Sequence, residues 1–227
     1  MIGAADWPRL EALLDAEERA RANRFRFRHD RESYVAAHAL LRAMLSDRIP
    51  VAPPRWRFTT NPQGKPEAVM PAGQPRLRAN LSHTRGLAAV ALTVDHDVGV
   101  DVEWRSRDGL TLELADRFFA PAEVAALEAM PAPRLNEGLF AFWTLKEAFI
   151  KAVGLGLSLP LDVFAFTLEP LGIDFVPGHE IAGPWLFRRF RPTEGHAMAL
   201  ALRHPAPSRV TISARPADLP ALLRHRD

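Results

Sequence analysis

The chain contains no cysteine, which excludes disulfides, thiolate zinc sites, iron–sulfur clusters and cysteine nucleophiles. Lysine is also scarce, because only three of the 29 basic residues, Lys65, Lys146 and Lys151, are lysine and the rest are arginine. A compact ammonium does different chemistry from a planar guanidinium, so these lysines are candidates for a specific role. The alternative is that the three lysines occur by chance and have no specific role.

The sequence also lacks a membrane-spanning run. No apolar stretch approaches the roughly 20 residues that cross a bilayer, and the N-terminal segment carries acids early, unlike a secretory signal. Over 227 residues, 48% are hydrophobic and 25% are charged, which is ordinary globular composition. We therefore expect a cytoplasmic protein without membrane contact, built from one large or two small domains.

The apolar periodicity predicts mixed helix and strand. Residues 1–48 have helical spacing, and a proline-rich loop with short edge strands follows over 51–74. Strands are expected at 87–94 and 98–103, and helices at 112–119, 121–130 and 137–153. From Phe164 onward the pattern predicts short strands, in FAFTLE, PWLFRRF, HAMALALR and RVTISAR.

A weak internal repeat is visible in the order of glycine, apolar strand, turn and second strand. RGLAAVALTVDHDVGVDVE resembles EGHAMALALRHPAPSRVTISAR in this order. Two related α/β halves divided near Asp95 would produce the repeat, and so would chance similarity between apolar strands.

The segment VGVDVE presents two acids on one face of a strand. Side chains alternate along a strand, so Asp101 and Glu103 share a face about 7 Å apart, opposite the valines. One interpretation is a solvated edge strand whose acids face water. The other is a hard-cation site, since paired oxygens without cysteine or clustered histidine favour Mg²⁺ over zinc.

The helix expected over 137–153 adds a third acid. Glu147 and Lys151 are four residues apart and share a face, with Trp143 one turn earlier. An ordinary surface ion pair is one interpretation. Alternatively, Glu147 joins Asp101 and Glu103 as an oxygen donor for Mg²⁺, and Lys151 places a cation beside a bound phosphate.

Several polar residues gather in other short motifs. NLSHTRG, which holds Ser82 and His83, suits an anionic ligand or forms a hydrogen-bonded turn. A Ser–His nucleophile pair is not expected here, because the side chains of adjacent strand residues point to opposite faces. NPQGKP offers Lys65 as a point charge but is not a P-loop. An arginine stretch binds phosphate or nucleic acid, or is a solvated face, and comprises Arg21, Arg24, Arg26, Arg28 and Arg31.

The ordered set NPQGKP, NLSH, GVDVE, RFF and FWTLKEAFIKAVGLGLSLPL resembles the Sfp-type 4′-phosphopantetheinyl transferases, over about Arg21 to Leu161. The resemblance implies an α+β fold of two similar α/β halves related by a pseudo-twofold, which we divide into 1–95 and 96–227. It also implies Mg²⁺-dependent transfer of phosphopantetheine from coenzyme A to a carrier-protein serine, with release of adenosine 3′,5′-bisphosphate.

The resemblance further implies roles for individual residues. The implied Mg²⁺ ligands are Asp101, Glu103 and Glu147. The implied coenzyme A contacts are Arg21, Lys65, Ser82, His83 and Lys151, of which Lys65 grips a nucleotide phosphate and Lys151 lies near the diphosphate. Thr84 stands where many members have serine or glutamine.

A mechanism follows from these roles. Glu147, directly or through a bound water, is the candidate base for the serine hydroxyl, while Lys151 and His83 stabilise the leaving phosphate. The carrier is acidic in most such systems, so we expect arginines to steer it onto an apolar patch around Arg117, Phe118 and Phe119.

Two other functions fit parts of the pattern. A Mg²⁺-dependent phosphodiesterase or nuclease would use the same three acids without a carrier. A nucleic-acid-binding module would use the arginine stretch, but a net charge of +2 argues against it. We expect a monomeric transferase that binds no nucleic acid.

Overall fold

Helices form the N-terminal part of the chain, as the periodicity predicts. The computed structural model describes residues 2–224. Its first helices are η1 (Ala4–Asp6), α1 (Trp7–Glu11), α2 (Ala16–Ala22) and α3 (Arg28–Ser46). α2 begins at a capping box, in which the Asp15 carboxylate accepts from the Glu18 N–H and the Glu18 carboxylate accepts from the Asp15 N–H. The helix prediction is confirmed, although separate helices occupy the region.

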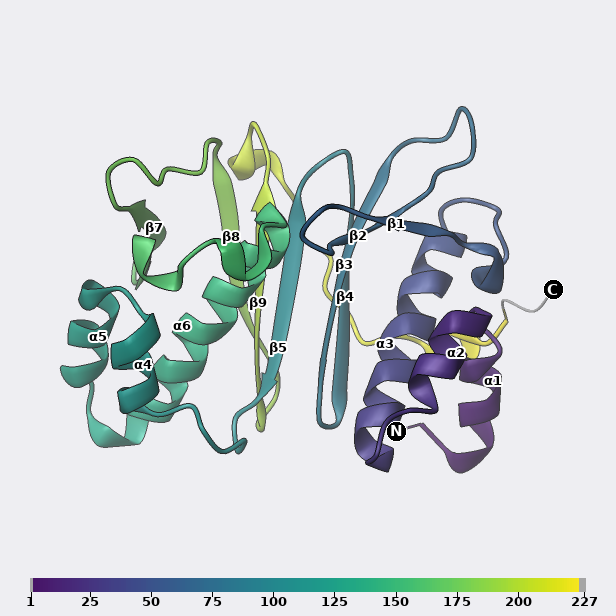
Figure 1. Ribbon diagram of the computed structural model, residues 1–227, viewed down its shortest axis with the longest axis horizontal. Helices are drawn as coiled ribbons and strands as arrows, with labels where there is room; N and C mark the ends of the chain where they lie inside the picture. Colours follow the sequence, from purple (N-terminus) through teal and green to yellow (C-terminus); the bar gives the residue numbers. More distant parts are fainter. Residues whose placement is uncertain (1, 225–227) are drawn as a thin grey trace.

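Two antiparallel hairpins follow these helices. The elements are η2 (Pro53–Arg55), β1 (Phe58–Thr60), β2 (Pro66–Ala68), β3 (Leu77–Thr84) and β4 (Leu87–Val94). β1 pairs with β2, and β3 pairs with β4 from Leu77 opposite Val94 to Thr84 opposite Leu87. α3 packs on one face of the β3–β4 hairpin through a buried cluster that includes Leu41 and Leu45 (Figure 1).

A second group of elements forms the other side of the molecule. An antiparallel sheet has the order β5–β9–β8, from β5 (Val98–Trp104), β8 (Trp185–Thr193) and β9 (His196–Arg203). α6 (Ala132–Val153) packs against β5 and β9 (Figure 1). The remaining elements are α4 (Leu112–Phe118), α5 (Pro121–Glu128), η3 (Gly156–Ser158), η4 (Leu161–Val163), β6 (Phe164–Leu168) and β7 (Leu171–Phe175).

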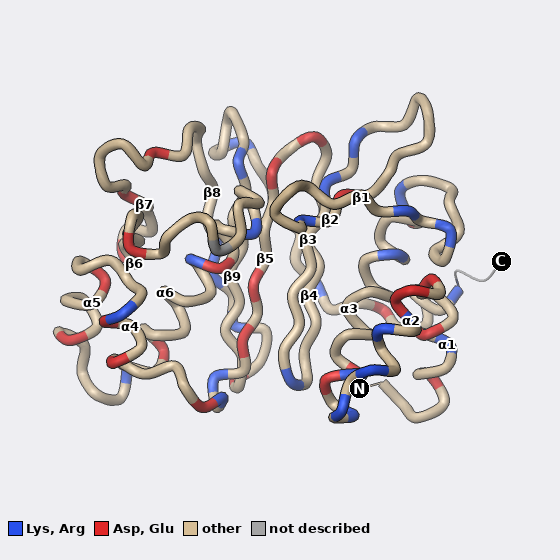
Figure 2. Tube along the Cα trace, in the orientation of Figure 1, with Lys and Arg blue, Asp and Glu red and all other residues tan. Residues whose placement is uncertain are grey.

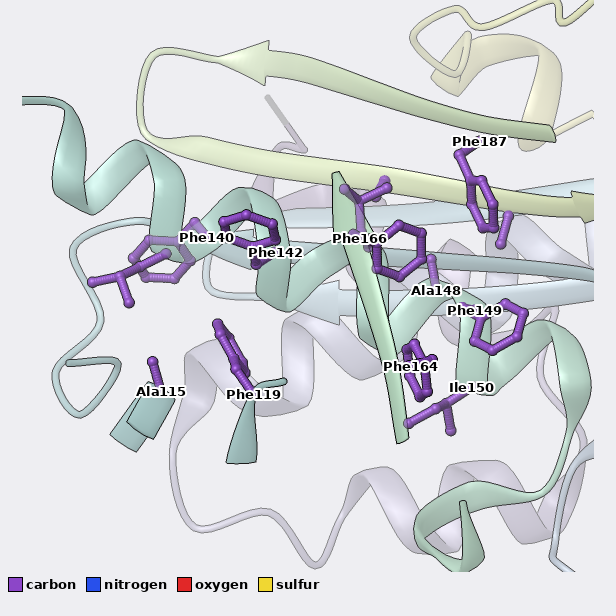
Figure 3. Close-up of a cluster of buried hydrophobic side chains, with 14 of the residues drawn as sticks. Ala115, Phe119, Phe140, Phe142, Ala148, Phe149, Ile150, Phe164, Phe166 and Phe187 are labelled. Carbon is purple, nitrogen blue, oxygen red and sulfur yellow. The ribbon is translucent and has the colours of Figure 1, made fainter. Parts of the chain in front are cut away.

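The largest hydrophobic core lies around α6. Phenylalanines from α6, β6 and β8 meet there, as Figure 3 shows for Phe149, Phe164, Phe166 and Phe187. At its edge Lys146 and Glu123 form a fully buried ion pair at 2.7 Å. This pair joins α6 to α5. α6 also packs against β5, which runs through the centre of the molecule.

The chain returns to the N-terminal helices at its end. After η5 (Pro207–Arg209) the segment RVTISAR contains no strand, so that strand prediction is wrong. The segment leaves the sheet and leads to α7 (Leu219–Leu222), where Leu222 and Leu223 are buried against α1 and α3. The second strand of the proposed internal repeat is therefore missing.

The expectation of an α+β fold in two parts is confirmed. The exact division at residue 95 remains a prediction. Within residues 2–224, no helix combines the length and apolar character that a bilayer-spanning helix requires.

Candidate active site between the two halves

β5 is buried on both faces and runs through the middle of the molecule. Val98 and Val100 lie in a hydrophobic cluster with β4 and β9, as the alternation predicts. Asp101 and Glu103 are only 4% and 9% exposed. Figure 2 shows acidic positions along β5 at the junction of the two halves. The interpretation of a solvated edge strand is therefore wrong, because the acids do not face water.

The glycine in VGVDVE allows β5 to lie directly against α6. A Cβ built on Gly99 would be 2.0 Å from the Ala148 carbonyl oxygen and 2.4 Å from the Ala152 nitrogen. Those distances are far below van der Waals contact, so only glycine fits without moving the backbone. The close approach brings the acids of β5 next to Lys151 on α6.

Asp101 is the centre of a buried polar cluster. Lys151 Nζ donates to Asp101 Oδ1 at 2.7 Å and to Ser82 Oγ at 3.1 Å. The Ser82 hydroxyl donates to the same carboxylate oxygen at 3.0 Å. Asp101 Oδ2 is buried and has no hydrogen-bond partner. Residues far apart in the sequence therefore converge on one side of this carboxylate and leave the other oxygen available.

Glu103 is held by two partners that contact each other. It accepts a hydrogen bond from Trp143 Nε1 at 3.1 Å and forms an ion pair with Arg107 at 2.9 Å. The Arg107 guanidinium lies over the Trp143 ring at 5.3 Å from its centroid. Burial and the neighbouring Asp101 charge raise the pKa of Glu103 to about 7.

Glu147 lies within electrostatic reach of the same cluster. Burial and then the charge of Asp101 raise the pKa of Glu147 above its usual range. No residue within 2–224 forms a hydrogen bond or ion pair with the Glu147 carboxylate, and Lys151 pairs with Asp101 instead. The surface ion pair between Glu147 and Lys151 is therefore not formed.

The donor set suits a hard divalent cation. Mg²⁺ prefers carboxylate oxygens, and the charge of Asp101 contributes to the raised pKa of Glu103 and of Glu147. Asp101 Oδ2 is a buried acceptor that receives no hydrogen bond within residues 2–224. Over the described range 2–224, however, no three histidine or acidic side chains are close enough together to form a metal site. The chemistry of the residues fits the ion, although Glu103 is turned toward Trp143.

His83 lies beside the cluster, on the opposite face of β3 from Ser82. Its ring is nearly perpendicular to that of Tyr34, with centroids 6.1 Å apart. Burial and then the positive charges of His38 and Lys151 lower the pKa of His83. His83 and Glu103 both line a cleft of about 410 Å³ between the N-terminal turn of α3 and the end of β5. The prediction that Ser82 and His83 point apart is confirmed.

Lys65 and Arg21 lie outside the carboxylate cluster. Lys65 Nζ donates to the carbonyl oxygens of Ala152 at 2.8 Å and Val98 at 3.3 Å, so it binds the end of α6 and the start of β5. Burial and the Arg78 charge lower the pKa of Lys65 to about 8. Arg21 is exposed, with its guanidinium 5.6 Å from the centroid of the Tyr34 ring.

Sequence reasoning missed the partners of Glu103. Arg107 was not among the predicted site residues, although it lies only four residues after Glu103 in the sequence. Trp143 was placed on the face of Glu147 and Lys151, which left its bond to Glu103 unseen. Both contacts depend on the register of β5 against α6, which the motifs alone do not specify.

The acids of β5 and α6 lie around the half-buried Lys151, an arrangement that suits a phosphate-bearing ligand, and comparisons with known proteins show which class of protein this is. The model described as the 4'-phosphopantetheinyl transferase superfamily matches residues 97–201, and one described as 4'-phosphopantetheinyl transferase, N-terminal, matches residues 3–94. The chain belongs to the 4′-phosphopantetheinyl transferase superfamily, and it is an enzyme of the transferase class.

Several relatives match most of the chain. A 4'-phosphopantetheinyl transferase of Bacillus subtilis is 31% identical over 207 residues, which cover 90% of this chain and 88% of that one. The Nostoc sp. transferase HetI is 30% identical over 195 residues, which cover 85% of this chain and 80% of that one. A Synechocystis sp. relative is 35% identical over 155 residues, which cover 66% of this chain and 61% of that protein.

Proposed function

We propose that this chain transfers 4′-phosphopantetheine from coenzyme A to a serine of a carrier protein and releases adenosine 3′,5′-bisphosphate. The serine oxygen forms a bond to the phosphorus that bears the pantetheine, and the bond from that phosphorus to the nucleotide phosphate breaks. The observation that carries the proposal is the ion pair between the buried Asp101 and the half-buried Lys151, with Glu103 and Glu147 in electrostatic reach of it at the junction of the two halves.

Asp101, Glu103 and Glu147 are the proposed Mg²⁺ ligands. When bound, the ion supplies positive charge that offsets the diphosphate of coenzyme A. The buried Oδ2 of Asp101 and the effect of the Asp101 charge on the pKa of Glu103 and Glu147 support this assignment. Trp143 and Arg107 orient Glu103, which limits the positions that its carboxylate can take.

The remaining charged groups act on the proton and on the leaving phosphate. Glu147 accepts the proton of the serine hydroxyl, because its carboxylate has no protein partner in the described structure and its raised pKa makes it a better base. Lys151 and His83 stabilise the charge that develops on the departing nucleotide phosphate. Lys151 already lies at the cluster, 2.7 Å from Asp101 Oδ1.

Coenzyme A is proposed to contact both halves. His83 lines the cleft directly, and Arg21 is connected to it through the ring of Tyr34. Lys65, Ser82 and Lys151 complete the proposed set, although Lys65 donates to two backbone carbonyls and Ser82 donates to Asp101. Binding of the nucleotide through Lys65 therefore requires its ammonium to exchange these partners.

The carrier is proposed to dock near the end of α4. Phe118 is 47% exposed and Arg117 is also exposed, whereas Phe119 is buried at 3%. The apolar patch expected from Arg117, Phe118 and Phe119 is thus reduced to the first two. The protein is proposed to act as a cytoplasmic monomer.

The deciding experiment incubates the protein with coenzyme A, Mg²⁺ and a panel of apo acyl, peptidyl and aryl carriers, and then weighs each carrier by mass spectrometry. A gain of one phosphopantetheine group, absent when either coenzyme A or the enzyme is omitted, is the expected result. Hydrolysis of coenzyme A or of nucleotides with no carrier modified would instead support a phosphodiesterase.

A further inference from the structure

β3 and β5 run side by side but do not share a backbone ladder. β3 pairs with β4 alone, and β5 pairs with β9 alone. In place of backbone pairing, three side chains of β3 accept hydrogen bonds from the outward N–H groups of β5. Asn80 Oδ1 accepts from Val100 at 2.8 Å. Ser82 Oγ accepts from Val102 at 3.2 Å and Thr84 Oγ1 accepts from Trp104 at 3.3 Å.

This polar ladder follows from the strand period of two. Asn80, Ser82 and Thr84 alternate along β3 and therefore share the face that meets β5. The intervening Leu81 packs instead on the other face, in the cluster with α3. Across β4, Asn80 and Ser82 are paired with Ala91 and Ala89, whose small side chains leave room for β5 to approach. The polar ladder, Asn80–Ser82–Thr84, joins the two halves.

The rungs of the polar ladder lie on either side of both proposed metal-binding acids. Asp101 is between the bonded amides of Val100 and Val102, and Glu103 is between those of Val102 and Trp104. The hydrogen-bonding capacity of Ser82 is fully used, because its one proton goes to Asp101 while it accepts from Val102 and Lys151. The middle rung of the polar ladder therefore belongs to the carboxylate cluster.

We propose that Asn80, Ser82 and Thr84 are positioning residues for the transferase, which fix the backbone of β5 so that Asp101 and Glu103 present their carboxylates correctly. The N-terminal half thereby sets the geometry of acids that belong to the C-terminal half. Thr84 also lines the cleft that His83 lines, so Asn80→Leu is the variant that separates positioning from direct contact with coenzyme A. The inference rests on the proposed function, because positioning has meaning only for a reaction that uses these acids.

The test removes one hydroxyl at a time from the same hairpin. Thr84→Val keeps the shape of the side chain and loses the acceptor for Trp104, whereas Thr84→Ser keeps the acceptor. Thr93→Val is the matched control, since Thr93 lies on β4 opposite Arg78 and forms no side-chain hydrogen bond within residues 2–224. Asn80→Leu, which frees the amide of Val100, is a second variant should Thr84→Val fold poorly.

Two measurements are made on each protein. Amide hydrogen exchange, followed by NMR without ligand, should accelerate at Trp104 on the order of tenfold in Thr84→Val, because a partly buried N–H loses its partner. Steady-state kinetics should show kcat lowered roughly fivefold or more with the KM for coenzyme A nearly unchanged, as expected when preorganisation rather than binding is lost. Thr84→Ser should keep the exchange rate at Trp104 and kcat near their wild-type values, and Thr93→Val should change neither.

Other outcomes distinguish a failure of the positioning role from a failure of the proposed function. An active wild-type enzyme whose kcat is unaffected by Thr84→Val and by Asn80→Leu would overturn the positioning role, as would an equal loss in Thr93→Val. A rise in the KM for coenzyme A with kcat unchanged would also overturn it, since it would indicate direct contact with the substrate. A wild-type protein that modifies no carrier would overturn the proposed function itself.

Discussion

Asp101 determines the electrostatics of its neighbours more than any other side chain in the site. Its negative charge contributes to the raised pKa of both Glu103 and Glu147, while Lys151 and Ser82 donate hydrogen bonds to its Oδ1. Within residues 2–224, the Glu147 carboxylate has no hydrogen-bond or ion-pair partner. Motif and spacing singled out the three acids, whose role as metal ligands stays a prediction, but they did not indicate which acid would pair with the lysine.

The first prediction concerns Glu147. We expect Glu147→Gln to lose most turnover, by roughly a hundredfold or more, since general-base catalysis contributes on the order of 10²–10⁴. The fold should be unchanged, because the carboxylate makes no hydrogen bond that the amide would disrupt. Carrier modification is measured by mass spectrometry and unfolding by circular dichroism. Glu137→Gln, an exposed change on the same helix, is the control. Near wild-type rates in Glu147→Gln would refute the assignment.

The second prediction concerns Lys65, whose pKa is about 8 in the folded protein against an ordinary value of 10.5. The unfolded chain therefore holds this proton up to about pH 10.5, whereas the folded protein releases it near pH 8. Between these values the unfolded state binds more protons, so the free energy of unfolding gains a contribution that rises with pH. Below pH 8 burial of the charged lysine costs stability.

The comparison is with Lys65→Met, which keeps much of the apolar stem and removes the titration. The difference in the free energy of unfolding, wild type minus variant, should increase between about pH 8 and pH 10.5, measured by urea unfolding at several pH values. Other titrating groups contribute equally to both proteins and cancel. Parallel stability profiles would mean that Lys65 keeps its ordinary pKa.

At the scale of elements, strands and helices were predicted well where their pattern is local. The expected strand at 87–94 is β4, and that at 98–103 is β5 with one residue more. α6 extends to Ala132 at its N-terminal side, where Pro131 and Pro133 made the helix look shorter in the sequence. The strand predicted in RVTISAR is absent, since pairing in a sheet depends on distant partners that a local pattern does not contain.

The third prediction tests the contact between β5 and α6. Gly99→Ala would place a methyl group 2.0 Å from the Ala148 carbonyl oxygen, and backbone atoms cannot move away as a flexible side chain could. We expect a loss of about 3 kcal/mol or more in the free energy of unfolding. Gly195→Ala is the control, because the nearest atom to its Cβ is 3.8 Å away. Chemical denaturation of both variants is the measurement, and equal stability would contradict the close approach.

At the scale of the whole molecule, the site exists only because the two halves meet. β5 supplies two acids, α6 supplies Glu147 and Lys151, and β3 supplies Ser82 from the other half. The tail adds a further connection, since Leu222 and Leu223 are buried among N-terminal helices. The motifs predicted that Asp101 and Lys151 lie together, whereas Lys65 and Arg21, which were predicted for the same site, lie outside that cluster. The motifs did not predict the side-chain ladder or the returning tail, which depend on how separate elements pack.

The last prediction concerns the encounter with the carrier. The 29 basic residues are nearly balanced by 27 acidic ones, so attraction of an acidic carrier has to come from local arginines such as Arg117, which is exposed beside Phe118. Because salt screens exposed charges, the KM for the carrier should rise roughly threefold between about 0.05 and 0.5 M salt. Arg117→Gln should weaken this dependence, whereas Phe118→Ala should raise the KM at every salt concentration by removing apolar contact. Kinetics across ionic strength distinguish the two contributions, and a KM for the carrier that ignores salt in the wild type would exclude electrostatic steering.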